Sequence, residues 1–532
     1  MNSLEILQEK VAGAIKLIKR QYLSKDENYP WLIGYSGGKD STCASQLVFK
    51  SLVELKKEGA DLKRNVVIFS SDTLIENPLV KQIIKKNIEL INKKAEEIGL
   101  PVKAVILAPT IENTFWVNVI GKGYPTPNTM FRWCTDRMKI LPADTFVKKN
   151  IDENGEVIMV LGVREGESGT RDRVLKTHNI EGETLMKHTT MPNAYVFAPI
   201  RNFDTVDVFG YLSAMESPWG SSNKELYFFY EESGAGECPI FLSQQDKTSS
   251  NACGNSRMGC WCCTVVTKDK SLSGFIDTGW HDELKPLLEF RNWLASIRDN
   301  EEYRCFYRMN GSVYTKKLET KHIGEDTFIV IAGKNRSNSV MIPVSKDGTV
   351  GTGSGYTLIE KDSLRKYMEE NKMSFKDPRV AKIVLKDTIT GEFFKIGTGP
   401  FNGKAKIEIF EKLMDAEHEY NSLSAEKTYL ISDEEINEIK RLWSKSSIDP
   451  VTIDEIMEKN GRNSVDFVMD SFEVMNQKYL KDLAEIMKKS GLDMEVLASL
   501  IQSERECINN NDKNGMQSAI ETIFESDKVN YQ

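Results

Sequence analysis

The sequence has 532 residues, too many for one ordinary hydrophobic core, so we expect several domains. Its 40% hydrophobic and 28% charged residues are typical of a soluble globular protein, and neither a membrane helix nor a signal peptide is visible, which predicts a cytoplasmic protein without membrane contact. The net charge of −8 argues against a strongly basic nucleic-acid-binding chain, but residues 401–532 hold 16 Lys+Arg and 27 Asp+Glu, and the rest hold 54 and 51. We therefore expect a phosphate-rich substrate to meet the mildly basic body of the chain.

The first part of the chain alternates apolar runs with amphipathic stretches. The predicted helices cover 4–22, 39–56, 77–98 and 205–216, and the predicted strands cover 31–35, 64–72, 101–109, 156–164 and 194–200. Strands that alternate with helices predict an α/β fold with a mainly parallel sheet flanked by helices. The ligand site of such a sheet lies at the carboxyl ends of its strands.

The later part of the chain changes character. Residues 217–280 contain turn formers, a cysteine cluster and few periodic segments, whereas 301–400 are rich in strand patterns and glycine. KIVLKDTITGEFFKI predicts a hairpin that turns at Thr390–Gly391, TVGTGSGY (349–356) predicts a loop, and long helices are predicted from 402 on. The predicted domains are 1–216, 217–300 with the cysteines, 301–400 rich in strands and an acidic helical region 401–532.

The stretch SGGKDS (36–41) follows the first predicted strand and opens a helix. It is not a Walker loop, because Ile33 stands where that motif needs glycine and Asp40 follows the lysine where Ser or Thr is required. A strand-to-helix turn still leaves backbone N–H groups for an anion, and the helix dipole favours negative charge there. We expect Gly37 and Gly38 to take positive φ and let the backbone approach a phosphate closely. Asp40 is expected to hold Mg²⁺ or to orient the loop.

SGGKDS after an apolar strand resembles the PP-loop of the ATP pyrophosphatase superfamily. The resemblance implies an adenine nucleotide alpha hydrolase-like fold and a loop that grips the β- and γ-phosphates of ATP·Mg²⁺. It also implies that ATP is cut between its α- and β-phosphates, so that pyrophosphate leaves and the substrate is adenylated.

Four further stretches resemble the phosphoadenosine phosphosulfate (PAPS) reductase branch of that superfamily. They are SSDTLIENP (70–78), FRWCTDRMKILP (131–142), LGVREGESGTRDR (161–173) and FAPIRNFDTVDVFGYL (197–212), with Phe203 and Phe209 at tryptophan positions of that branch. The implied ATP-binding residues are Ser36, Gly37, Gly38, Lys39, Asp40, Ser41, Ser70, Asp72, Thr73, Gly162 and Arg164. The implied catalytic residues are Lys39, Asp40, Arg132 and Lys139, and the implied ligands of the substrate phosphate are Ser168, Arg171 and Arg173. Sulfonucleotide reduction itself is not expected, because Cys507 is followed by Ile and has no histidine nearby.

The second and third of these stretches are rich in cations. They hold Arg132, Arg137, Lys139, Arg164, Arg171 and Arg173. Such groups suit phosphate or sulfate oxyanions. For any single arginine, surface pairing with the neighbouring acidic residues is an equal alternative. For the whole set we expect an anion site.

Nine cysteines occur in the chain, and four of them fall within ACGNSRMGCWCCTVV (252–266). Cys260 and Cys263 have the CxxC spacing at which two thiolates meet one metal or cluster, whereas the adjacent Cys262 and Cys263 point opposite ways in an extended segment. The expected ligands are Cys134, Cys253, Cys260 and Cys263, with Cys262 or Cys238 in reserve. Only one CxxC pair is present, and no histidine lies between His188 and His281, so an iron–sulfur cluster (4Fe-4S) is favoured over zinc, with unligated buried cysteines as the alternative. Cys43 is expected in the core.

The PP-loop, Cys134 in RWCT, the cysteines around GCW and the long C-terminal extension together resemble the DndC family of DNA phosphorothioation sulfurtransferases. That resemblance implies exchange of a non-bridging phosphate oxygen of DNA for sulfur, a cysteine desulfurase as sulfur donor, and DndD- and DndE-like partner subunits. Cys262 departs from the family pattern, which leaves the choice between 262 and 263 open. The alternatives are a tRNA-thiolating enzyme, which usually carries two CxxC pairs, and an ATP-sensing subunit of a DNA modification complex.

Overall fold

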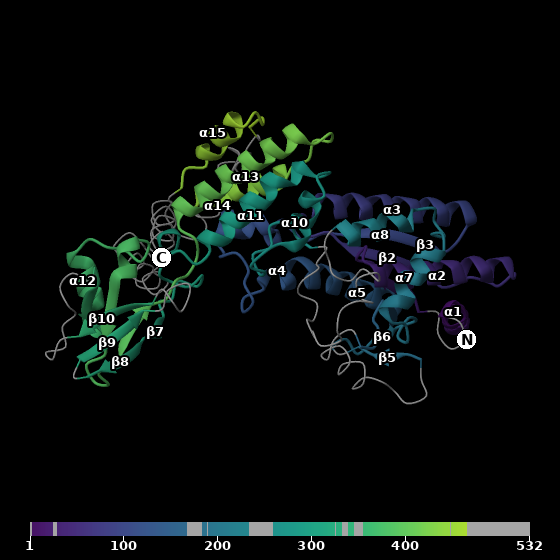
Figure 1. The fold of residues 1–532 in the computed structure, drawn as a ribbon, viewed down its shortest axis with the longest axis horizontal. Coiled ribbons are helices and arrows are strands. Elements are labelled where there is room, and N and C mark those ends of the chain that lie inside the picture. The colour runs from purple at the N-terminus through teal and green to yellow at the C-terminus, as the bar shows by residue number, and fades with distance from the viewer. Residues whose placement is uncertain are drawn as a thin grey trace, which may run out of the picture. The chain divides into compact units, whose positions relative to one another are not determined.

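The structure is a computed structural model that describes residues 3–24, 29–166, 184–188, 190–232, 259–324, 326–331, 339–344, 355–446 and 448–464. The chain divides into two compact units (Figure 1). The first comprises residues 1–115, 126–296 and 415–431, and the second comprises 116–125, 297–414 and 432–532. Among the described helices, none is both long and apolar enough to cross a membrane. The four domains predicted from the sequence stay predictions.

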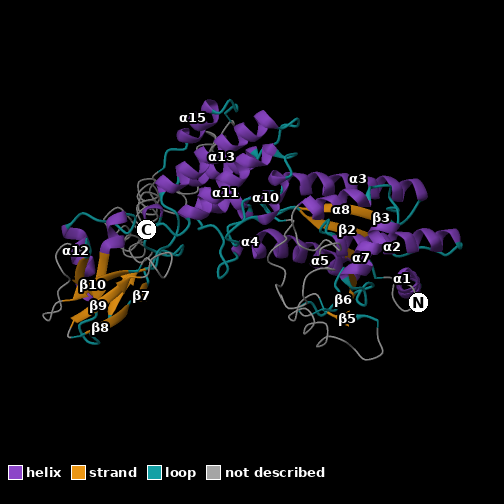
Figure 2. Cartoon of the chain, viewed as in Figure 1, coloured by secondary structure: helices purple, strands orange, loops and turns teal. Residues whose placement is uncertain are grey.

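The first unit contains a six-stranded sheet with the order β3-β2-β1-β4-β6-β5. Figure 2 labels β2, β3, β5 and β6 of this sheet and draws strands in orange. Its strands are β1 (Trp31–Gly34), β2 (Val66–Ser71), β3 (Val102–Leu107), β4 (Val157–Val160), β5 (Met186–Lys187) and β6 (Ala194–Phe197). All neighbouring strands run parallel except β5, which is antiparallel to β6. The mainly parallel α/β fold predicted from the sequence is therefore confirmed. β1 pairs with β2 on one side and β4 on the other, so the order reverses at the carboxyl ends of β1 and β4, where such sheets bind ligands.

Helices surround this sheet, and some pack on its strands while others pack on neighbouring helices. The helices of the first unit are α1 (Ser3–Tyr22), α2 (Lys39–Lys57), α3 (Pro78–Ile98), α4 (Trp133–Thr135), α5 (Leu141–Asn154), α7 (Thr205–Ala214), α8 (Asn223–Glu232), α10 (Lys270–Asp277) and α11 (Lys285–Ile297), the last of which ends one residue inside the second unit. α5 packs Val147 against Leu32 and Val157 of the sheet. α1 and α7 pack on α2, and Cys43 of α2 is fully buried, as expected.

Sequence reasoning missed several elements, among them α5 and α11. The segment 217–280 was expected to hold few periodic elements, yet α8 and α10 form there. α8 reads NKELYFFYEE, and its run of aromatic residues hides the helical spacing of its buried Leu226, Phe229 and Tyr230. Two π-helical turns, Val117–Lys122 and Asp136–Ile140, were also unforeseen.

The second unit contains a four-stranded and a three-stranded sheet, with the orders β11-β12-β13-β7 and β10-β9-β8. The strands are β7 (Thr315–Lys317), β8 (Glu319–Ile323), β9 (Asp326–Ile331), β10 (Val340–Val344), β11 (Thr357–Glu360), β12 (Ile383–Lys386) and β13 (Phe393–Ile396). A shared core of Ile329, Ile342, Val384 and Phe393 joins the two sheets, and α12 (Leu364–Glu370) packs on β11. The predicted hairpin is confirmed, because β12 and β13 pair antiparallel.

Helices follow the strand-rich region, as predicted. They are α13 (Gly403–Leu423), α14 (Asp433–Ser444) and α15 (Val451–Lys459). In the second unit, α14 packs on the π-helical turn Val117–Lys122, and the indole N–H of Trp443 donates to the Ile120 carbonyl at 3.0 Å. Most of the glycine run 349–356 and everything beyond 464 lie outside the described residues.

Candidate functional site

The predicted phosphate loop lies between β1 and α2. Gly37 has φ +73°, and a Cβ there would meet Ile84 at 2.9 Å, so this position requires glycine. Gly38 has φ −78°, so the expectation of positive φ at both glycines is wrong for Gly38, which instead caps α2 in an extended conformation. Ser41 Oγ accepts the N–H of Ser36 at 3.2 Å and donates to the Gly38 carbonyl at 3.1 Å. These bonds fold the loop over the positive end of α2.

The loop is anchored to the carboxyl end of β4 by a buried ion pair. Arg164 Nε donates to Asp40 Oδ1 at 2.6 Å, with side-chain exposures of 5% and 16%. Gly162 allows the close approach, since a Cβ there would lie 2.6 Å from the Asp40 carbonyl oxygen. Lys39 Nζ lies 3.4 Å from the other Asp40 oxygen. Of the two expectations for Asp40, the contacts support orientation of the loop.

Aromatic rings enclose Lys39, which is only 7% exposed. Its ammonium lies 5.9 Å from the Phe209 ring centroid and 5.5 Å from that of Tyr230. The backbone N–H of Lys39 donates to the Tyr230 hydroxyl at 3.2 Å. Phe209 stands at one of the tryptophan positions of the motif 197–212, but it was not predicted to lie at the site. Tyr230 was missed, because nothing in the aromatic run of α8 distinguishes it.

The carboxyl end of β2 carries the next predicted nucleotide ligands. Ser70 is buried, and its hydroxyl has no hydrogen-bond partner within the described part of the chain. Asp72 Oδ1 accepts the N–H of Leu74 at 2.7 Å, which stabilises Leu74 at φ +65°. A buried hydroxyl without a partner at this edge of the sheet suits a bound polar ligand.

Residues 73–77 connect this edge to the cysteine segment. The N–H of Asn77 donates to the Gly259 carbonyl at 3.2 Å, and the N–H of Trp261 donates to the Ile75 carbonyl at 3.1 Å. Thr73 Oγ1 lies 2.9 Å from Glu76 Oε1 and 3.5 Å from Cys260 Sγ. The nucleotide motif and the cysteine segment are therefore hydrogen-bonded to each other.

Glu76 is a buried carboxylate that sequence reasoning missed. It accepts the Thr73 hydroxyl and pairs with Lys139 Nζ at 3.3 Å. Its position in SSDTLIENP gives no sign of this role. The pair fixes the predicted catalytic Lys139 beside Cys260.

Three of the predicted ligand cysteines line one cavity of about 380 Å³. They are Cys134, Cys260 and Cys263, and Thr73, Arg132 and Lys139 line the same cavity. Cys262 is fully buried and does not line it, which favours Cys263 as the ligand of the adjacent pair. Cys253 and the reserve Cys238 lie outside the described residues, as do Ser168, Arg171 and Arg173.

Burial raises the pKa of two of these thiols, Cys134 and Cys260. It raises the pKa of Cys134, and the neighbouring Cys263 raises it further. Burial, followed by the charge of Glu76, raises the pKa of Cys260. Cys134 and Cys260 are therefore protonated at neutral pH unless a cation stabilises their thiolates.

The cavity has part of what a cluster site requires. Its donor set consists of thiols, which suits iron–sulfur chemistry. Within the described ranges, no group of three or more His, Cys, Asp or Glu side chains is arranged to hold a single metal ion. The described residues thus supply three thiols of the right chemistry and an incomplete ligand set.

The predicted cations divide between two places. Arg164 pairs with Asp40 of the loop, whereas Arg132 and Lys139 line the cysteine cavity. Arg137 donates to Asn113 Oδ1 at 3.3 Å, which favours a structural role for that residue. Anion-binding groups are therefore present both at the nucleotide loop and beside the cysteines.

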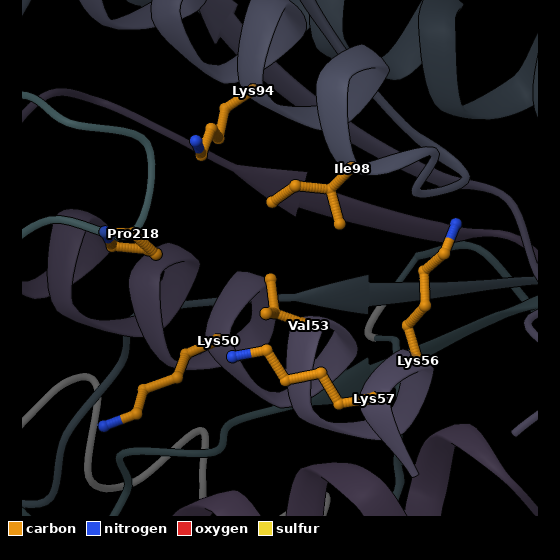
Figure 3. Close-up of a pocket in the computed structure, with 7 residues that line it drawn as sticks. All are labelled: Lys50, Val53, Lys56, Lys57, Lys94, Ile98 and Pro218. Carbon is orange, nitrogen blue, oxygen red and sulfur yellow. The ribbon is translucent and has the colours of Figure 1, made fainter. Parts of the chain in front are cut away.

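A second pocket, of about 550 Å³, lies between the C-terminal halves of α2 and α3 (Figure 3). Val53, Ile98 and Pro218 form its apolar part, and lysines surround it. Lys56 donates to the Gly99 carbonyl at 2.5 Å, and Lys94 pairs with Glu97 at 3.1 Å. These lysines complement the negative ends of two helices, which accounts for their position without a ligand.

Residues 30–266 match the family model described as the phosphoadenosine phosphosulfate reductase domain. The match includes the loop, the motifs after β2 and β4, and the cysteine segment, and it confirms the predicted relation of this part of the chain to that branch. It supports an enzyme that uses ATP or a related nucleotide.

Two curated relatives are uncharacterized proteins of Methanocaldococcus jannaschii. They are both 26% identical, over 227 and 244 residues, which is 43% and 46% of this chain. The chain matches 39% and 49% of their own lengths, so it spans less than half of either relative.

Similar solved structures include a PAPS reductase of Candida auris in a phosphate complex, with a TM-score of 0.26 and 12% identity over 43% of this chain and 93% of that chain. The U34-tRNA thiolase NcsA of Methanococcus maripaludis, with its [4Fe-4S] cluster, has a TM-score of 0.24 and 15% identity over 47% and 85%. An FMN adenylyltransferase of Candida glabrata has a TM-score of 0.25 and 12% identity over 39% and 56%. At these TM-scores, none of the three says what this chain binds or does.

Proposed function

We propose that this chain is an ATP pyrophosphatase that activates a DNA backbone phosphate for sulfur transfer. The supporting observation is the direct contact between the nucleotide motif after β2 and the cysteine segment, where Thr73 lies 3.5 Å from Cys260. A nucleotide site alone is compatible with many activities. A nucleotide site that shares hydrogen bonds with a cavity of thiols favours sulfur chemistry on an adenylated substrate.

In this proposal the loop binds the β- and γ-phosphates of ATP·Mg²⁺. The helix dipole of α2 and the Lys39 ammonium stabilise the pyrophosphate as it leaves. Arg164 and Asp40 hold the loop in place, and the Ser70 hydroxyl is available to the nucleotide. Asp72, at the carboxyl end of β2, is the carboxylate that would serve Mg²⁺ in this proposal.

The chemistry has two displacements. A DNA phosphate oxygen attacks the α-phosphorus of ATP, pyrophosphate leaves, and an adenylated phosphodiester forms. A sulfur nucleophile then attacks the DNA phosphorus, and the former non-bridging oxygen leaves as part of AMP. Arg132 and Lys139, which line the cysteine cavity, would neutralise the crowded phosphates.

Cys134, Cys260 and Cys263, together with Cys253, would hold a 4Fe-4S cluster. Such a cluster would supply thiolate-bound iron beside the activated phosphate, either to carry sulfur or to fix the cavity walls. The chain's own contribution is to position three thiols in one cavity and to connect that cavity to β2 through Thr73.

The choice of DNA, of a cysteine desulfurase as sulfur donor and of DndD- and DndE-like partners rests on the motif resemblance. Residues 1–400 have a net charge of only +3, so partner subunits would supply part of the affinity for DNA. A tRNA substrate and a purely nucleotide-sensing role are the alternatives that experiment has to separate.

The test uses anaerobically purified protein and ATP labelled at the α-phosphate. We expect AMP and pyrophosphate in the presence of DNA and a desulfurase, and phosphorothioate dinucleotides after nuclease digestion. Lys39→Ala should abolish AMP formation, whereas Lys63→Ala, at an exposed surface lysine, should not. ADP as the product, or thiolated tRNA nucleosides in place of phosphorothioates, would contradict the proposal.

A further inference from the structure

Tyr230 contacts both anion-binding groups of Lys39. Its hydroxyl accepts the Lys39 backbone N–H at 3.2 Å, and its ring centroid lies 5.5 Å from the Lys39 ammonium. That N–H belongs to the first residue of α2, where a helix has donors without intrahelical partners. The tyrosine hydroxyl therefore occupies the acceptor position that a phosphate oxygen takes at a helix N-terminus.

Phe209 of α7 and neighbouring residues of α8 surround Tyr230. Its ring packs edge-on against Phe209 at 5.5 Å, and Phe209 also contacts Lys39. Leu226 and Phe229, on the same helix, pack against Gly37 and leave no room for a water molecule there. A Cβ on Gly38 would lie 3.4 Å from the Tyr230 hydroxyl, so glycine at 38 keeps the hydroxyl close to the loop.

We propose that Tyr230 is a positioning residue that holds the loop ready and is displaced from the Lys39 amide when a nucleotide phosphate binds. This inference rests on the proposed binding of ATP at the loop. One N–H makes a single strong hydrogen bond, and a charged phosphate oxygen is a better acceptor than a neutral phenol. The phosphate therefore replaces the hydroxyl, while the ring stays beside the ammonium.

Two consequences follow from this exchange. Without nucleotide, the hydroxyl satisfies a buried donor and keeps the loop in its binding geometry. With nucleotide, α8 loses its hydrogen bond to the loop, so its backbone opens more readily. Nucleotide binding is in this way coupled to the local opening of α8. Because such coupling is reciprocal, stabilising α8 against the loop would weaken nucleotide binding by the same factor.

The experiment measures pyrophosphate binding by calorimetry and amide hydrogen exchange in α8. Tyr230→Phe removes the competing hydroxyl and keeps the ring, so pyrophosphate should bind about 2- to 10-fold more tightly than to the wild type, the range of one neutral hydrogen bond. Pyrophosphate should speed exchange in α8 of the wild type and change it much less in Tyr230→Phe. Tyr227→Phe, which removes a hydroxyl from the same helix, is the matched control and should behave as the wild type.

Each result has a distinct meaning. Equal or weaker binding of pyrophosphate to Tyr230→Phe, with wild-type binding intact, overturns the role of Tyr230 and leaves the proposed function standing. Binding as expected with no AMP formed from ATP overturns the proposed function alone. If neither protein binds pyrophosphate, the loop does not take phosphates and both proposals fail.

Discussion

The ion pair between Asp40 and Arg164 offers a quantitative test of how the loop is held. Asp40→Asn keeps the side-chain volume and removes the charge, which leaves Arg164 and Lys39 as two neighbouring buried cations. Removing one partner of a buried pair costs about 3–5 kcal/mol. Arg164→Met should cost less, about 2 kcal/mol, because Asp40 keeps Lys39 at 3.4 Å.

Thermal unfolding with and without pyrophosphate measures these costs. At about 2–4 °C per kcal/mol, this cost should lower the Tm of the unit that contains Asp40 by about 6–20 °C in Asp40→Asn. Pyrophosphate should restore more of this loss in Asp40→Asn than in Arg164→Met, because the anion neutralises the two cations. Asp61→Asn is the control: its partner Lys63 lies at 3.0 Å, but both side chains are more than 60% exposed, so it should cost less than about 1 kcal/mol.

A double-mutant cycle decides whether the reasoning is sound. If Asp40 and Arg164 stabilise the loop through each other, the double variant should cost about 1–3 kcal/mol less than the sum of the single variants. Strictly additive costs would refute the claim that this pair anchors the loop to β4.

Three further predictions concern other parts of the chain. Gly162→Ala should weaken ATP binding and destabilise the protein by about 2 kcal/mol or more, because its Cβ would lie 2.6 Å from the Asp40 carbonyl oxygen. Gly13→Ala, with open space around the new Cβ, should do neither. Equal effects of the two substitutions on ATP binding and on the Tm would contradict this prediction. Burial and the neighbouring Cys263 raise the pKa of Cys134. Iodoacetamide should therefore label Cys134 of the metal-free protein slowly at pH 7 and faster as the pH rises. Fast labelling at pH 7 would contradict the raised pKa. Burial lowers the pKa of Lys406 from 10.5 to about 8, so the unfolded state binds more protons than the folded state between these pH values. The free energy of unfolding should therefore rise with pH across pH 8–10.5, by up to about 3 kcal/mol. Lys406→Met should flatten this rise, as measured by urea titrations.

The sequence predicted the parts of the site that depend on local pattern. SGGKDS predicted a loop between a strand and a helix, because glycines allow a tight turn there, and Gly37 takes the predicted positive φ. The apolar runs identified the strands, because a buried parallel sheet needs continuous apolar segments. The carboxyl-edge rule then brought Gly162 and Arg164 beside Asp40, which the structure shows.

The contacts made by distant side chains could not be predicted in this way. Tyr230 reaches the loop from 191 residues further along the chain, on a helix whose aromatic run has no clear period. Glu76 appears as an ordinary acid until Lys139 and Thr73 are placed around it. Gly38 was assigned a positive φ because it is glycine, although its N-cap position needs only an extended backbone.

The segment after β2 connects the two halves of the proposed chemistry. Ser70, the last but one residue of β2, has a hydroxyl without a partner in the described chain, and three residues later Thr73 bonds Glu76 and contacts Cys260. Because the backbone around Leu74 is held at positive φ by Asp72, this short connection has little freedom to absorb a displacement. Under the proposed function, a nucleotide bound at Ser70 would therefore act on the position of Cys260, and sulfur chemistry at the cavity would depend on the loop being occupied. Such an arrangement would prevent a reactive sulfur from reacting until an adenylated phosphate is present beside it.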